Sequence, residues 1–189
     1  MGSTEEGLTP RDAVLLAIDA AGGTVEGRTA IQKIAYFVAV ALADDLGHRA
    51  HYYGPYSRPV EYALAQTALG EKVTETMERF PSYASGPDIR KYTYALTGDG
   101  VSEVAAIRAT YGAQADMIKV TVDAIHKAVP DFDQNTLSMA AKIHFIVSQQ
   151  DQPTKLAEIP ALANQLGWRI SEEQVARSVE LLRGLELLT

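Results

Sequence analysis

The 189-residue chain contains no cysteine, which excludes disulfides, thiol nucleophiles, and zinc-finger or iron–sulfur sites built on thiolates. It also lacks a long apolar run. The longest, at residues 34–43, is far shorter than the roughly 18–20 residues of a membrane helix. The N-terminal segment is acidic and polar, unlike a secretory signal peptide. We therefore expect a cytoplasmic protein with no membrane partner.

Positive charge is scarce as well. The chain carries 17 Lys and Arg against 24 Asp and Glu, a net charge of −7. Residues 1–23 hold one basic and four acidic side chains, residues 24–98 hold eight of each, and residues 99–189 hold eight and twelve. Strong non-specific binding to nucleic acid usually requires a basic surface. The chain is therefore no general polyanion binder, and only its middle segment escapes the acidic bias.

Signatures of catalysis and metal binding are also missing. The sequence has no Gly-x-Ser-x-Gly elbow, phosphate-binding loop or His-Glu-x-x-His motif. His48 and His51 are three residues apart but lie near a predicted strand, and His126 and His144 have no ligand-like neighbours. We expect no enzyme activity, no cofactor and no bound metal.

What the chain does have is a hydrophobic content of 47%, ample for a core, with mostly helical spacing. Thr9 and Ser57 are typical N-caps, each followed closely by proline. The second helix is apolar on most sides, with Gln32 and Lys33 on its more exposed face. The elements expected up to residue 96 are a helix from Pro10 to Gly22-Gly23, a short strand within 24–27, a helix from Arg28 that ends before Gly47, an extended segment at 49–53, a helix at 57–69, and strands at 72–80 and 89–96.

The remainder of the chain is predicted to be helical. Residues 81–88, rich in Pro, Gly and Ser, form the expected loop between the two strands. A helical pattern follows from 97 to 129 with a break at Gly112, and further helices are expected at 136–149, 155–166 and 171–184. The last two resemble a helix-turn-helix (HTH) whose second helix runs into a strand at the end of the chain.

Helix, short strand, helix, helix and β-hairpin is the element order of a winged helix-turn-helix. The segment Tyr94-Ala95-Leu96-Thr97-Gly98-Asp99-Gly100 is similar to the Tyr-x-Leu-Thr-x-x-Gly motif that follows the wing in many winged-helix regulators. We predict a mainly α fold with a minor β part. Residues 1–98 form the winged helix-turn-helix domain with a β-hairpin wing. Residues 99–189 form a helical region, in which 99–129 link or dimerise and 136–189 make a second HTH-like unit.

A more specific resemblance lies at residues 27–57. Gly27-Arg28, Ile31-Gln32-Lys33 and Tyr53-Gly54-Pro55-Tyr56-Ser57 resemble the Gly-Arg, Leu-Gln-Lys and Tyr-Gly-Pro-Tyr-Ser pattern of the uncharacterised YwgA-like family and of related phage-associated, antitoxin-like winged-helix proteins. The chain departs from that pattern at Thr29-Ala30, where basic residues are common. The resemblance implies a winged helix in a prokaryotic regulatory or defence setting, and it implies no chemistry.

The helix at 57–69 is the expected recognition helix. Arg58, Tyr62 and Gln66 share one face, where Arg and Gln suit base edges and Tyr suits phosphate. The alternative is a solvated face that touches no DNA, which Glu61 favours.

Two further surfaces carry candidate contacts to DNA. The hairpin cations suit the backbone or minor groove, although charges on hairpins commonly serve only to protect a sheet edge. The start of the second helix suits phosphate, although its Gln and Lys are equally suited to tying down a neighbouring loop. The complete candidate set is Arg28, Thr29, Gln32, Lys33, Ser57, Arg58, Tyr62, Gln66, Lys72, Arg79, Arg90 and Lys91.

The segment from Tyr52 to Tyr56 is dense in tyrosine. It is suited either to stacking or peptide binding, or to a rigid turn that wedges aromatic rings under the recognition helix, and we favour the wedge. The helices at 97–129 carry two apolar stripes. One stripe is expected to pack internally and the other against a second copy, with an entirely intramolecular core as the alternative.

Two functions follow from this fold. The first is a transcriptional regulator that binds double-stranded DNA by occupancy, as a homodimer and without catalysis. The alternative is a protein-interaction module, antitoxin-like or an adaptor in a defence system, that uses the same fold to bind a protein partner. A cluster of positive charge on the helix at 57–69 favours the first function, and an exposed apolar patch there favours the second.

Overall fold

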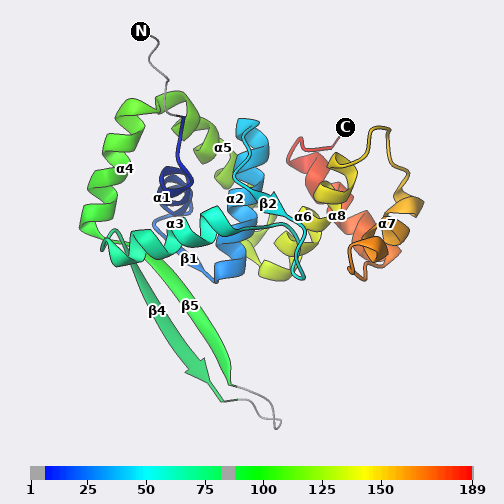
Figure 1. Ribbon diagram of the computed structural model, residues 1–189, viewed down its shortest axis with the longest axis horizontal. Helices are drawn as coiled ribbons and strands as arrows, with labels where there is room; N and C mark the ends of the chain where they lie inside the picture. The colour runs from blue at the N-terminus through cyan, green and yellow to red at the C-terminus, as the bar shows by residue number, and fades with distance from the viewer. Residues whose placement is uncertain (1–6, 82–87, 189) are drawn as a thin grey trace.

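A computed structural model of the protein describes residues 7–81 and 88–188, so most of the predicted loop at 81–88 lies outside the described residues. The chain is mainly helical with a small antiparallel sheet (Figure 1), which confirms the predicted class. The elements in chain order are α1 (Pro10–Ala20), β1 (Thr24–Glu26), α2 (Arg28–Leu42), β2 (His48–Arg49), β3 (Tyr56–Ser57), α3 (Arg58–Leu69), β4 (Val73–Phe80), β5 (Ile89–Leu96), α4 (Gly98–Thr110), α5 (Gly112–Ala128), η1 (Pro130–Phe132), α6 (Gln134–Ser148), η2 (Leu156–Glu158), α7 (Ile159–Gln165) and α8 (Glu172–Gly184).

The helix starts follow the capping chemistry of the sequence. Thr9 and Asp12 form a capping box at α1, with Pro10 in the first turn. The Ser57 hydroxyl accepts from the backbone N–H of Val60 at α3. At α4 the Thr97 hydroxyl accepts from the N–H of Gly100. The predicted break at Gly112 is confirmed, because α4 ends at Thr110 and α5 begins at Gly112.

The extended segment predicted at 49–53 is wrong in its extent. Only His48 and Arg49 are in a strand, and they pair with Tyr56 and Ser57. The N–H of Gly54 donates to the carbonyl of His51 over 2.9 Å, which closes a turn in the segment. Gly54 has a φ of +99°, a conformation that glycine adopts without steric cost.

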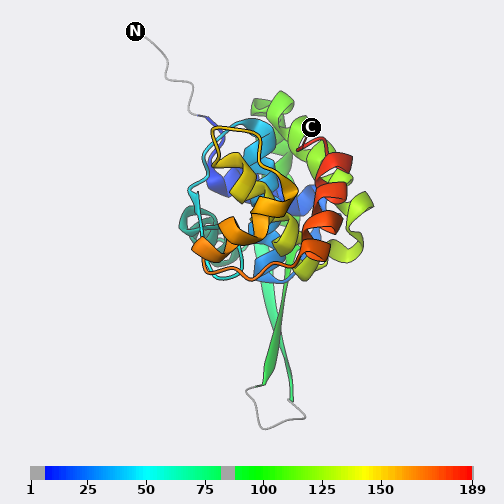
Figure 2. The same cartoon turned by 90° about the vertical axis from the view of Figure 1, so that its right-hand side faces the viewer.

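The main sheet has the order β1-β5-β4 and is antiparallel throughout. β4 and β5 pair over eight residues each, but β1 pairs only with residues 93–95 of β5. The base of the hairpin is anchored by the buried side chains of Val73 and Tyr94, while residues 74–80 are exposed. The two strands therefore project well beyond the helical body, as both views show (Figures 1 and 2).

The core is organised around α2, whose residues 30–39 are all buried. α2 packs against α1, α5 and α6, and α5 also packs against α1. The buried side chains of α5 are Ala115, Ile118, Val122 and Ile125. Buried residues before and after residue 98, the predicted domain boundary, belong to one continuous cluster, so the core has no gap at this point in the chain.

The outward side of α4 and α5 keeps Val101, Met117 and Val120 exposed. The inner apolar stripe of α5 is used for intramolecular packing against α1 and α2. Dimerisation through the outer side stays a prediction.

The C-terminal helices α6, α7 and α8 pack together beside α2. Trp168 is buried, and its Nε1–H donates to the carbonyl of His51 over 2.7 Å, which ties this unit to the loop before β3. The strand predicted after the last helix is wrong, since residues 185–188 contain turns and no strand. Glu186 has a φ of +58°, and the N–H of Leu187 donates to the carbonyl of Leu182, so the chain folds back on the helix end.

Among the described residues, no helix combines the length and the apolar character that crossing a membrane requires.

The segment from Tyr94 to Gly100 joins the sheet to α4 through tight packing. Tyr94 is buried and Leu96 half-buried, and the Thr97 hydroxyl donates to the carbonyl of Glu71 over 2.6 Å. A Cβ at Gly100 would lie 2.0 Å from the carbonyl oxygen of Lys72, which is backbone and cannot move aside cheaply. Only glycine therefore fits at the last position of this motif.

We predict that Gly100→Ala lowers the free energy of unfolding by about 2 kcal/mol or more, because the added methyl group overlaps the backbone of Lys72. Gly98→Ala is the matched control in the same helix turn, since a Cβ there meets no atom within 4 Å. That control should stay within about 0.5 kcal/mol of the wild type. Urea unfolding followed by circular dichroism measures both, and equal stabilities of the two variants would contradict the packing argument.

Candidate nucleic-acid interface

Arg28 lies at the start of α2 and is held at the base of the hairpin. Its Nε–H donates to the Tyr94 hydroxyl over 2.7 Å, and its guanidinium lies 4.0 Å from the centre of the Tyr92 ring. A terminal nitrogen is 3.2 Å from a carboxylate oxygen of Glu75. The hydrogen bond to Tyr94 and the nearby Glu75 carboxylate raise the pKa of Arg28. Thr29 is half-buried beside it.

The exposed positions predicted for Gln32 and Lys33 are wrong. Both side chains are buried, because the segment between α2 and α3 covers the face on which they lie. The Gln32 side-chain amide donates to the carbonyl of Ser57 and accepts from its N–H, both over 2.9 Å. The Lys33 ammonium donates to the carbonyl of Pro55 over 2.6 Å. These two residues tie down a loop, which is the alternative that the sequence left open.

Ser57 is also unable to reach DNA. It is fully buried, and its hydroxyl donates to the carbonyl of Leu46 while capping α3 at Val60. The candidate set therefore loses Gln32, Lys33 and Ser57 to internal hydrogen bonds.

The exposed face of α3 has the composition that the sequence predicts. Arg58 and Tyr62 are exposed and Gln66 is half-buried. The same helix exposes Glu61, and Leu69 is exposed at 79% of its surface. One cation and one carboxylate leave this face without a cluster of positive charge, so the feature that would favour DNA binding through this helix is missing from it.

The hairpin cations differ in how far their charge is matched. Lys72 is near the carboxylates of Asp99 (3.6 Å) and Glu103 (3.9 Å) at the base, and Lys91 pairs with Glu26 at 2.8 Å. Farther out, Arg79 is 3.8 Å from Asp88. Within the described part of the chain, Arg90 forms no ion pair.

Arg79 and Arg90 are directly opposite each other in the strand register. Side chains that are opposite in an antiparallel pair lie on the same face, and like charges there destabilise the pairing. Edge protection alone does not require this arrangement, since one cation on the strand edge suffices. Asp88 partly neutralises Arg79, so the charge of Arg90 is the one left for an anion from outside.

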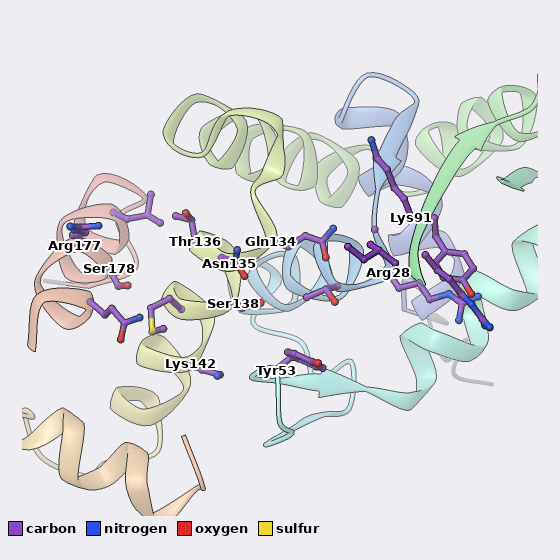
Figure 3. A pocket seen from close by; sticks show the side chains of 18 of the residues that line it. Arg28, Tyr53, Lys91, Gln134, Asn135, Thr136, Ser138, Lys142, Arg177 and Ser178 are labelled. Carbon is purple, nitrogen blue, oxygen red and sulfur yellow. The ribbon is translucent and has the colours of Figure 1, made fainter. Parts of the chain in front are cut away.

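A cleft of about 1200 Å³ lies beside the outer part of β5, between the hairpin and the helices α6 and α8 (Figure 3). The start of α2 and the turn that carries Tyr53 also line it. Its described lining residues include no Asp or Glu. The basic side chains that line it are Arg28, Arg90, Lys91, Lys142 and Arg177.

Lys142 and Arg177 were missed by reasoning from the sequence. Lys142 is on α6 and Arg177 on α8, far along the chain from the hairpin, and no local pattern sets them apart from solvated helix residues. Arg177 pairs with Glu173. Lys142 has no carboxylate partner within the described residues, its ammonium is 5.5 Å from the Trp168 ring, and partial burial lowers its pKa.

The tyrosine-rich turn differs from the predicted wedge. Tyr52 and Tyr53 are exposed at 73% and 60%, and their rings meet edge to face at 4.8 Å. The physical reason is the close approach of Gly54 to α6, where a Cβ would lie 3.0 Å from Lys142 and 3.3 Å from the carbonyl of Ser138. The turn is therefore held by its glycine and by Lys33, and its first two aromatic rings face outward, with Tyr53 lining the cleft.

The described part of the chain contains no group of three or more His, Asp or Glu side chains arranged to hold a metal ion. No protein-family model matches the chain, and no curated protein matches its sequence. The resemblance to the YwgA-like family stays a prediction.

We predict that the free energy of unfolding of the wild type rises between about pH 7 and pH 9.5. Lys33→Met should make this rise smaller. Burial, and to a lesser extent the charge of Lys142, lower the pKa of Lys33 to about 7, against about 10.4 in an unfolded chain. The unfolded state therefore binds more protons in this range, so the free energy of unfolding of the wild type increases as the pH rises.

The check is the urea midpoint of wild type and Lys33→Met across that pH range, with Lys127→Met as the control at an exposed lysine. The wild type and the control should rise in parallel, and the Lys33 variant should rise less steeply. Parallel curves for all three proteins would mean that Lys33 keeps its charge in the folded state across this pH range, so that burial does not lower its pKa.

Proposed function

We propose that the protein is a winged-helix DNA-binding regulator that acts by occupying duplex DNA, without catalysis. The order α1-β1-α2-α3-β4-β5, with the two-residue strands β2 and β3 between α2 and α3, and the sheet order β1-β5-β4 support this fold assignment. In this assignment α3 is the recognition helix and β4–β5 the wing.

The observation that carries the proposal is the cleft beside the hairpin. In a chain of net charge −7, its described lining includes five basic side chains and no acidic one. Local charge of this kind attracts phosphate although the molecule as a whole is acidic. Release of counterions from the DNA then supplies the affinity.

The proposed contact set differs from the one expected from the sequence. It keeps Thr29 and the α3 residues Arg58, Tyr62 and Gln66. It keeps Arg28, Arg79, Arg90 and Lys91 around the hairpin, and Lys142 and Arg177 join them across the cleft. Lys72 is left out of the set, because the carboxylates of Asp99 and Glu103 lie near its ammonium group. Because α3 supplies one cation, most phosphate contacts come from the hairpin and the cleft.

We predict that Arg58→Ala combined with Arg90→Ala weakens binding to duplex DNA and flattens its salt dependence. Each lost phosphate contact lowers the slope of log K against log salt by about 0.9. The control is Arg169→Ala combined with Arg183→Ala, which removes the same charge from exposed positions outside the cleft and α3. Fluorescence anisotropy with a labelled duplex, from about 50 to 200 mM salt, measures the slope.

The expected order is a steep slope for the wild type and the control, and a slope shallower by about 1–2 for the Arg58/Arg90 variant. Equal slopes for the Arg58/Arg90 variant and the Arg169/Arg183 control would mean that α3 and the wing do not contact the DNA. No binding of the wild type at the lowest salt would reject the DNA proposal.

The exposed apolar side of α3 favours a second candidate function, binding of a protein partner. Tyr62 is exposed at 67% and Leu69 at 79%, with exposed Ala65 between them. Such an exposed apolar strip fits the surface of another protein. For this function, Tyr62→Ala with Leu69→Ala would abolish the interaction with the partner, whereas Arg90→Ala would leave it unchanged.

A further inference from the structure

The outer end of the hairpin carries large apolar side chains in water. Phe80 is exposed at 46%, Ile89 at 63% and Met77 at 45%. Phe80 and Ile89 are directly opposite each other and form the last described pair of the β4–β5 ladder. They therefore lie on the same face of the two strands.

The next pair toward the base is Arg79 opposite Arg90. Since side chains alternate between faces along a strand, the two guanidinium groups and the two apolar side chains are on opposite faces of the same short stretch. The described end of the hairpin thus combines two cations with two apolar groups within two adjacent pairs.

The surroundings of this end identify the partner that it fits. Phe80 and Ile89 line the cleft, and so do Arg90 and Lys91 of the same strand end. The charged residues of its described lining are all basic, so the end of the hairpin borders the place where phosphates are expected. A two-stranded ribbon fits into a groove of duplex DNA. A purely apolar partner would leave the charge of Arg90, which forms no ion pair among the described residues, unmatched on the opposite face.

DNA offers both kinds of contact at one point. Arginine side chains are attracted to the negative potential of the minor groove. Apolar side chains such as Phe, Ile and Met are used by minor-groove proteins to enter between base steps, and they kink the duplex by about 20–90°. Unstacking a base step costs free energy, and the additional contact surface of the bent duplex offsets this cost.

Resting on the proposed DNA-binding function, we propose that Phe80 and Ile89 form a wedge that unstacks one base step and bends a duplex bound against the cleft and the hairpin. Arg79 and Arg90 bind the phosphates or groove edges beside the opened step. The bend falls preferentially at flexible TA or CA/TG steps, where unstacking costs least.

The experiment uses the full chain and a duplex of about 30 base pairs, close in length to the sites that proteins commonly bend. A fluorescence donor and acceptor at the two ends report bending through energy transfer. A 2-aminopurine in place of adenine at a central TA step reports unstacking through an increase in its fluorescence. Anisotropy on the same duplex reports binding independently of both.

The test variant is Phe80→Ala combined with Ile89→Ala, and the control is Met117→Ala combined with Val120→Ala. The control removes two exposed apolar side chains from α5, on the helical body. All four residues are exposed, so thermal unfolding should be nearly unchanged in both proteins. Circular dichroism on heating is the check. Phe80→Leu, which keeps an apolar side chain, should retain part of the bend.

The wild type and the control are expected to bind, to raise energy transfer and to raise 2-aminopurine fluorescence. The Phe80/Ile89 variant should still bind but lose both increases. Binding by the wild type without either increase would overturn the wedge and leave the DNA-binding function intact. Equal increases for the Phe80/Ile89 variant and the wild type would likewise overturn it. Absence of wild-type binding would overturn the DNA-binding function, and the wedge with it.

Discussion

The side chain of Gln32 bonds to both backbone groups of Ser57, and the positions of α3 and the hairpin depend on this contact. Ser57 is the N-cap of α3, and α3 passes into β4 through a short connection at residues 70–72. Holding Ser57 on the buried helix α2 therefore orients the exposed face of α3, and the hairpin that follows α3 is fixed further by Val73 and Tyr94 in the core. The amide is neutral and satisfied as donor and acceptor, so its burial avoids the cost of an unpaired polar group.

Lys33 acts one residue farther along the same helix and has a different energetic character. Its ammonium group meets the carbonyl of Pro55 and no carboxylate among the described residues, which makes its burial costly in the charged form. In return, the turn that contains Gly54 is held against α6, and Tyr53 reaches the cleft. Two adjacent polar residues of α2 thus position the two surfaces, α3 and the tyrosine turn, that flank the proposed interface.

The function proposed for this acidic chain depends on where its basic side chains lie and on which of them have carboxylate partners. Glu75, Glu26 and Glu173 partly neutralise Arg28, Lys91 and Arg177, whereas Arg90 and Lys142 have no carboxylate partner within the described residues. A ligand with several phosphates competes for all five cations at once, because paired surface side chains exchange partners at little cost. Whether this cleft attracts phosphate is therefore decided by the local arrangement of charges and not by the net charge of the chain.

Local chemistry determined much of this protein from the sequence by itself. The caps at Thr9, Ser57 and Thr97, the break at Gly112 and the span of the hairpin strands follow from interactions within a few residues. The exposed face of α3 follows from helical spacing. Tertiary structure decided the rest. The burial of Gln32 and Lys33, the outward Tyr52 and Tyr53, and the arrival of Lys142 and Arg177 at the hairpin all depend on contacts between distant segments. Periodicity reports which side of a helix is apolar, but it does not report which loop covers the other side or which helix faces a strand across a cleft.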